Sequence, residues 1–179
     1  MNKFTKPWIK LRRNYWAALA FDVAAILLVF VLIHSWQSRH LLPGGEEVLA
    51  PDFVLTSLDQ ETYQLSDYRD RKTILYFFSP SCGICNKSMP NLQRLYEGDT
   101  EGGLQIFAVA LDFVSRAEVV EFSNRHHFSF PVLLGGWDEI SNYRIRGFPT
   151  YYIINERGRV EQRSVGYSTL LGLRWRSSG

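Results

Sequence analysis

The stretch TILYFFSPSCGIC, residues 73–85, joins an apolar run to the only two cysteines of this 179-residue chain. Its first six residues are aliphatic, β-branched or aromatic without interruption, a pattern typical of a strand buried on both faces. Beyond the cysteines, Met89, Leu92 and Leu95 recur at helical spacing. The sequence therefore predicts that the two cysteines open a helix directly after a buried strand.

This predicted helix start gives the cysteines a direct chemical role. Cys82 is expected among the unpaired N–H groups of the first turn, where the helix dipole favours an anion and hence a thiolate. Cys85 follows three residues later, close enough to close a small disulfide with Cys82. Together they predict a catalytic two-electron thiol–disulfide couple that needs no bound cofactor and no metal.

Three other uses of the cysteines fit the sequence less well. A structural zinc site takes about four ligands, and here the two cysteines stand far from His126 and His127. A c-type haem site has His directly after the second cysteine, where this chain has Asn86. A structural disulfide more often closes a longer loop, because short loops constrain the unfolded chain less. The two histidines instead suit the end of a predicted helix, where a basic side chain complements the dipole.

The N-terminal part of the chain predicts a membrane anchor. Residues 17–33 read AALAFDVAAILLVFVLI and are apolar apart from Asp22. A helix of this length spans about 25 Å, which is short for a bilayer core. Tyr15, Trp16 and Trp36 can lie at the two interfaces and extend it. No small-residue cleavage site follows, so the sequence favours an uncleaved signal-anchor over a signal peptide that is removed.

The distribution of basic residues predicts the orientation of this anchor. Five of them precede the apolar run: Lys3, Lys6, Lys10, Arg12 and Arg13. They place the N-terminus in the cytoplasm and the rest of the chain outside, in a compartment where disulfides persist. We therefore expect a single-pass protein of the cytoplasmic (inner) membrane of a bacterium, with its catalytic domain facing the periplasm. The net charge of +2 is too small to suggest nucleic-acid binding.

Four segments follow from these patterns. Residues 1–16 form a basic cytoplasmic leader, 17–36 the transmembrane signal-anchor, and 37–47 a linker that contains one Pro and two adjacent Gly. Residues 48–179 form one α/β domain, in which predicted strands alternate with helices and end in a hairpin and a short C-terminal helix capped by Ser168. We expect a central mixed sheet with helices on both faces.

The domain resembles the thioredoxin-like domains of membrane-anchored, extracytoplasmic thiol–disulfide oxidoreductases of the TlpA/ResA type. The resemblance covers roughly residues 48–172. It rests on APDF (50–53), LSDY (65–68), the cysteine motif, FPVL (130–133) and YRIRGFPT (143–150). It implies a thioredoxin-like fold with a cis peptide bond at Pro149 beside the cysteines. Such a turn would present the backbone of Phe148 to an extended substrate segment. The substrate-binding residues expected from this resemblance are Phe148, Pro149 and Thr150, together with Gly83 and Ile84 between the cysteines.

The chain departs from the family pattern around the cysteines. Ser81 stands directly before the first cysteine, where the family usually has Trp. Ser88 occupies a position where many members carry Glu. Tyr76 stands where thioredoxins themselves keep a buried Asp. The sequence therefore offers no evident internal proton acceptor for the pair.

The function expected from these observations is thiol–disulfide exchange in exported proteins. Cys82 would attack a substrate disulfide and Cys85 would resolve the mixed disulfide. The partners implied are disulfide-bearing exported proteins, which the family resemblance extends to apocytochromes of cytochrome c maturation, and a membrane or periplasmic reductant. The alternatives are an oxidase or isomerase of the same fold, a Cu(I)-binding chaperone, which would use two soft thiolates, and a peroxiredoxin-like peroxidase.

Overall fold

The computed structural model of the chain describes residues 7–38, 41–42, 48–99 and 102–177. It divides into two units, Met1–Arg39 and His40–Gly179. In the first unit a single 32-residue helix, α1 (Pro7–Ser38), contains the predicted anchor. Its segment Tyr15–Ile33 has a mean hydropathy of 2.6 and is long and apolar enough to cross a membrane. No part of this segment is buried within the protein, so α1 is a candidate single span.

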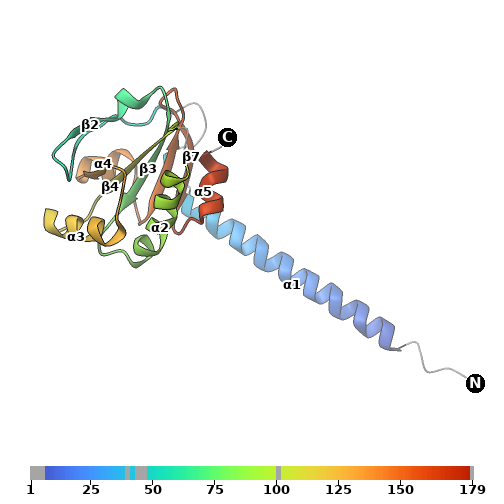
Figure 1. Ribbon diagram of the computed structural model, residues 1–179. Coiled ribbons are helices and arrows are strands. Elements are labelled where there is room, and N and C mark those ends of the chain that lie inside the picture. Colours follow the sequence, from blue (N-terminus) through green and yellow to red (C-terminus); the bar gives the residue numbers. More distant parts are fainter. Residues whose placement is uncertain (1–6, 39–40, 43–47, 100–101, 178–179) are drawn as a thin grey trace, which may run out of the picture. The chain divides into compact units, whose positions relative to one another are not determined.

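The second unit contains a seven-stranded mixed sheet in the order β2-β1-β5-β4-β3-β6-β7 (Figure 1). The three central strands β3, β4 and β5 are parallel, and the remaining neighbours pair antiparallel. The predicted buried strand is β3, whose seven residues are all buried. The strands are β1 (Val54–Ser57), β2 (Thr62–Gln64), β3 (Lys72–Phe78), β4 (Leu104–Ala110), β5 (Val132–Leu134), β6 (Thr150–Ile154) and β7 (Val160–Val165).

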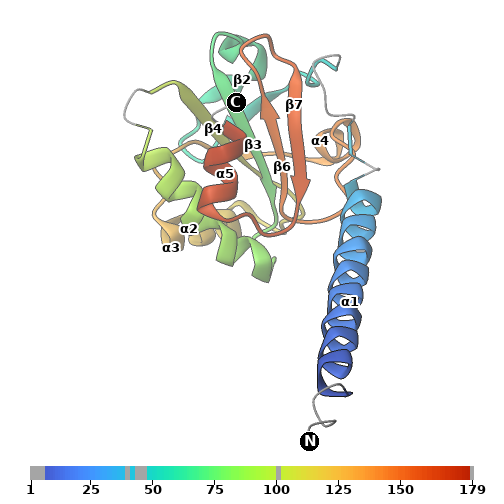
Figure 2. The ribbon, with the colours of Figure 1, turned by 90° about the vertical axis from the view of Figure 1, so that its right-hand side faces the viewer.

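Successive residues of the central strands point to opposite faces of the sheet, and each face has its own apolar core. Tyr76 and Phe78 of β3 face one core, and Leu75 and Phe77 face the other. The first core is covered by α2 (Gly83–Glu97), α3 (Arg116–His126) and α5 (Leu170–Ser177). The second is covered by the 3-10 helix η1 (Leu65–Tyr68) and by α4 (Trp137–Asn142). Figures 1 and 2 show α2 and α5 side by side on one face of the sheet. The expected sheet covered on both faces is confirmed.

The fold brings the cysteines to the carboxyl end of the parallel strands. β3 ends at Phe78, and α2 begins five residues later at Gly83. This helix is anchored on the first core by Met89 and Leu92, neither of which is exposed. Burying a side chain of this size contributes about 1.5–3 kcal/mol. In open α/β sheets, ligands bind at this edge.

Two local predictions differ from the structure. Leu41 and Leu42 lie within the predicted linker, but both side chains are buried in the second core. The backbone there is held by hydrogen bonds: the Leu42 N–H donates to the Tyr152 hydroxyl. The Arg163 guanidinium donates to the carbonyl oxygens of Leu41 and Leu42. The cap of α5 is Thr169, whose hydroxyl accepts from the N–H of Gly172, and the prediction of Ser168 was wrong by one residue. The other predicted linker residues, 37–40 and 43–47, include positions outside the described chain.

Candidate active site

Cys82 is the N-cap residue of α2, as the sequence predicts. Its Sγ accepts a hydrogen bond from the backbone N–H of Cys85 at 3.2 Å, and its carbonyl accepts from the N–H of Asn86. Both cysteines are free thiols. The sulfur of Cys82 therefore lies where the helix N-terminus favours negative charge, and Cys82 is only half-buried, so it is open to a substrate.

Cys85 has a different environment, one turn inside the helix. Its side chain is fully buried in the first core. Burial raises the pKa of the Cys85 thiol to about 12, and the hydrogen bond between its thiol and Cys82 acts in the same direction. The Cys85 proton is thus held on the buried sulfur while Cys82 is presented at the surface.

The loop before β6 lies against the reactive sulfur. The Sγ of Cys82 is 3.6 Å from the carbonyl oxygen of Phe148. The Phe148–Pro149 peptide bond is cis, which confirms the prediction. Thr150 is fully buried, and its hydroxyl donates to the carbonyl of Gly147 at 2.8 Å. The backbone of Phe148 can therefore face a substrate, whereas the Thr150 side chain holds the loop.

The residues between and before the cysteines form an open rim. Ile84 is 49% exposed, and nothing lies within 4 Å of the position that a Cβ would take at Gly83. Ser81 is also exposed, and its hydroxyl is hydrogen-bonded to that of Ser79 at 2.9 Å. With the short Ser81 in place of a large aromatic side chain, the approach to Cys82 is lined by a small polar group and one aliphatic side chain.

Sequence reasoning did not connect His126 with the cysteines. His126 is the last residue of α3, as predicted, but its Nε2 lies 2.9 Å from Oδ1 of Asn86, which follows Cys85. The amide nitrogen of Asn86 donates to the Cys82 carbonyl, so the histidine Nε2–H is assigned as the donor to Oδ1. Burial lowers the pKa of His126, with Arg125 and His127 acting in the same direction. A neutral His126 thus stabilises the first turn of α2 through its hydrogen bond to Asn86.

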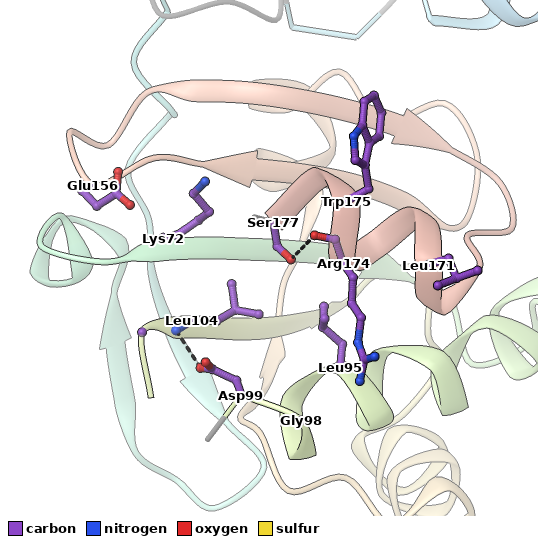
Figure 3. A pocket seen from close by; sticks show the side chains of 11 residues that line it. Lys72, Leu95, Gly98, Asp99, Leu104, Glu156, Leu171, Arg174, Trp175 and Ser177 are labelled. Carbon is purple, nitrogen blue, oxygen red and sulfur yellow. Dashed lines mark hydrogen bonds between the residues drawn. The ribbon is translucent and has the colours of Figure 1, made fainter. Parts of the chain in front are cut away.

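A large cavity lies away from the cysteines. It has a volume of about 810 Å³ and opens between the end of α2, the start of β3 and α5 (Figure 3). Lys72, Asp99 and Arg174 line it, and it contains no cysteine. Lys72 and Phe78 are the two ends of β3, a strand about 20 Å long. The cavity is therefore separate from the candidate active site. Among the described residues, no group of three or more His, Cys, Asp or Glu could hold a metal ion.

Comparison with known proteins gives a consistent result. Residues 47–163 match the model of the AhpC/TSA family. The thiol-disulfide oxidoreductase ResA of Oceanobacillus iheyensis is 36% identical over 174 residues, covering 94% of this chain and 90% of the relative. ResA of Geobacillus kaustophilus is 34% identical over 121 residues, covering 67% of this chain and 69% of the relative. A thiol:disulfide interchange protein of the thioredoxin family from Chlorobium tepidum has a similar fold, with a TM-score of 0.69 at 18% identity, over 76% of this chain and 97% of that structure.

Proposed function

Because this chain belongs to the AhpC/TSA family and is a thiol–disulfide oxidoreductase of the ResA type, we propose that it reduces disulfides in exported proteins through Cys82 and Cys85. One observation carries this proposal: Cys82 is half-buried at the N-cap of α2, and three residues later Cys85 is fully buried, which raises its pKa to about 12. The two sulfurs are thereby divided into one that meets the substrate and one that resolves the product.

The proposed reaction has two steps. The Cys82 thiolate attacks a substrate disulfide, forms a mixed disulfide and releases one substrate sulfur. Cys85 then loses its proton and attacks the Cys82 sulfur, which forms the Cys82–Cys85 disulfide and releases the second substrate sulfur. Each departing sulfur takes up a proton, so the substrate gains two electrons and the cysteine pair loses two.

The surface around Cys82 supports an extended polypeptide as the substrate. The substrate-binding residues we propose are Gly83 and Ile84 on the rim and Phe148 with Pro149 on the loop. The Phe148 carbonyl, 3.6 Å from the reactive sulfur, can pair with the backbone of a chain that lies across the cysteine. Thr150 contributes by holding this loop through Gly147. Apocytochromes awaiting haem are one class of exported substrate that would suit this site.

An insulin-reduction assay tests the proposed reaction. The full-length chain in detergent micelles, supplied with dithiothreitol, is expected to accelerate precipitation of the insulin B chain. The Cys82→Ser variant should return the rate to that of dithiothreitol alone, because the nucleophile is lost. A wild-type protein no faster than dithiothreitol would contradict the proposal. Tight binding of Cu(I) by such an inactive protein would support a copper chaperone instead.

We place the catalytic domain, residues 48–179, in the periplasm, tethered by α1 in the cytoplasmic membrane and recharged by a membrane or periplasmic reductant. The support is the basic leader before the span, which favours a cytoplasmic N-terminus. An enzyme reporter that is active only in the periplasm, fused after Gly179, is expected to be active. A reporter active only in the cytoplasm should be silent at the same position, and activity of that reporter would reverse the proposed orientation.

A further inference from the structure

Among the described residues, two tyrosine hydroxyls in the core that contains Cys85 are buried with no hydrogen-bond partner at ordinary distance. Tyr76 and Tyr151 are directly paired across β3 and β6, with ring centroids 4.8 Å apart. They are 0% and 2% exposed. In the part of the chain that the structure describes, neither hydroxyl makes a hydrogen bond of ordinary length. A buried hydroxyl without a partner destabilises a fold, so two neighbouring ones call for an explanation.

The other fully buried tyrosines, one in the sheet and one at the end of α4, do not share this property. Tyr152 and Tyr143 belong to the second core, on the opposite face. The hydroxyl of Tyr152 donates to the Tyr143 carbonyl at 2.6 Å, and that of Tyr143 donates to the carbonyl of Pro51. The unsatisfied pair is thus confined to the face that carries the cysteines.

The unsatisfied hydroxyls belong to the same core as Cys85. The hydroxyl of Tyr76 lowers the pKa of the Cys85 thiol, against the larger effect of burial. Burial raises the pKa of Tyr76 itself, with Tyr151 and Cys85 adding to the shift. Tyr76 therefore keeps its proton throughout the working pH range and can act toward a thiolate only as a hydrogen-bond donor.

A line of further hydroxyl groups continues from Tyr76. Burial raises the pKa of Tyr151 to about 12, and the hydroxyls of Ser88 and Ser168 act in the opposite direction. Ser168 in turn accepts a hydrogen bond from the Arg176 guanidinium at 3.2 Å. Polar side-chain groups of Cys85, Tyr76, Tyr151 and Ser168 therefore follow one another through an otherwise apolar core.

We propose that Tyr76 is a catalytic hydrogen-bond donor to the Cys85 thiolate, with Tyr151 as the residue that orients it. In the resting state, in which Cys85 is a neutral thiol, neither hydroxyl has a partner at ordinary hydrogen-bond distance among the described residues. When Cys85 loses its proton to attack the mixed disulfide, Tyr76 donates to the new charge. A donor preorganised where charge develops needs no rearrangement at the moment of reaction. This inference rests on the proposed roles of Cys82 and Cys85.

No carboxylate or cationic side chain competes with Tyr76 at this sulfur among the described residues. The groups that shift the pKa of Cys85 are Cys82, the backbone of Ser79 and Tyr76. On α5, Arg176 reaches Ser168, and on α3, His126 reaches Asn86 and not the thiol. Removing the Tyr76 hydroxyl should therefore leave the Cys85 thiolate without a side-chain donor.

The test is the Tyr76→Phe variant of the full-length chain in detergent micelles. A hydrogen bond to a charged group changes an equilibrium by about 10- to 100-fold, so the Cys85 thiolate fraction should fall by that factor. The thiolate that remains has a higher pKa and is therefore more nucleophilic. On a logarithmic scale, this offsets about half of the loss in rate that the smaller thiolate fraction causes. We expect the resolving step to slow about 3- to 10-fold.

Dithiobis-nitrobenzoate measures that step in a single turnover. It forms a mixed disulfide with Cys82, and a second thionitrobenzoate is released when Cys85 attacks. For Tyr76→Phe, the rising limb of the pH–rate profile should move up by about half to one pH unit. Tyr151→Phe should shift it in the same direction by less. Thermal stability should not fall in Tyr76→Phe, because the hydroxyl it loses has no partner in the resting state.

Tyr152→Phe is the matched control. Like the two test variants, it removes one buried phenol oxygen, but Tyr152 of β6 faces the second core, on the side of the sheet away from the cysteines. It should lower stability and leave the profile unchanged. A Tyr76→Phe profile that coincides with the wild-type profile, or with that of the control, would overturn the inference. Wild-type protein that releases only the first thionitrobenzoate would instead refute the proposed cysteine roles, so the two failures can be distinguished.

Discussion

At neutral pH an alkylating reagent is expected to modify Cys82 and to leave Cys85 intact in the folded protein. Cys85 is fully buried and its pKa is raised to about 12, so at pH 7 only about one molecule in a hundred thousand carries a thiolate there. Because the thiolate is the reactive form, alkylation of Cys85 should be slower than that of Cys82 by several orders of magnitude.

Mass spectrometry of the reduced full-length protein after treatment with iodoacetamide measures this difference. One added group is expected, on the peptide that carries Cys82. Raising the pH should increase the Cys85 rate about tenfold per unit up to its pKa. In denaturant, where burial is lost, both cysteines should react alike, which provides the control. Equal labelling in the folded state would show that Cys85 is not shielded as the structure indicates.

The Cys85→Ser variant is expected to accumulate mixed disulfides with its substrates in the cell. Cys82 remains able to attack, but no second thiol releases the bound substrate. Cys82→Ser should accumulate almost none, because its remaining thiol is buried and protonated. Turnover of both variants should fall to the uncatalysed background.

Non-reducing electrophoresis after acid quenching, followed by identification of the trapped proteins, provides the measurement. It also tests the substrate class, since the trapped chains should carry export signals. Equal trapping by both variants would mean that the roles of the cysteines are wrongly divided. Trapped proteins without export signals would contradict the proposed substrate class.

The parts of the fold that the sequence predicts well are those set by local patterns. The unbroken apolar run from Thr73 to Phe78 predicts a strand covered on both faces, and every residue of β3 is buried. Ser115 and Glu118 have the spacing of a capping box, and at the start of α3 the Ser115 hydroxyl accepts a hydrogen bond from the Glu118 N–H. In both cases the deciding interactions lie within a few residues of one another.

The sequence does not reveal contacts that depend on packing between distant segments. Leu41 and Leu42 belong to a Pro- and Gly-containing stretch typical of a linker, yet β6 and β7 supply hydrogen bonds that hold them in the second core. Ser168 is a good capping residue by type, but its hydroxyl accepts from Arg176 and its carbonyl accepts from Asn91, so the helix begins one residue later.

In the candidate site, too, some features follow from local sequence patterns and others depend on contacts between distant segments. The cysteine motif and the turn before β6 are local signals, and the structure brings Cys82 and Phe148 together. The pairing of Tyr76 with Tyr151 depends on the register of β3 and β6, and that of His126 with Asn86 on the packing of α3. In a single sequence, no spacing rule reveals such contacts.

The direction of electron flow is the central claim of the proposed function. Gly83 and Ile84 carry no charge and no side-chain donor. The helix start then remains as the main stabiliser of the Cys82 thiolate, worth about 0.3–1 kcal/mol when exposed. At about 30 mV per 1.4 kcal/mol, this contribution raises the reduction potential by only about 20 mV. The pair should therefore be closer to a reductant such as thioredoxin than to a strong oxidant.

The reduction potential of the cysteine pair tests this claim most directly. The full-length protein in detergent micelles is equilibrated with glutathione buffers of graded ratio, quenched with acid, and its free thiols are quantified. We expect a potential of about −270 mV, which would make the protein a reductant in an oxidising compartment. A potential above about −180 mV, in the range of disulfide isomerases and oxidases, would contradict the assignment as a reductase.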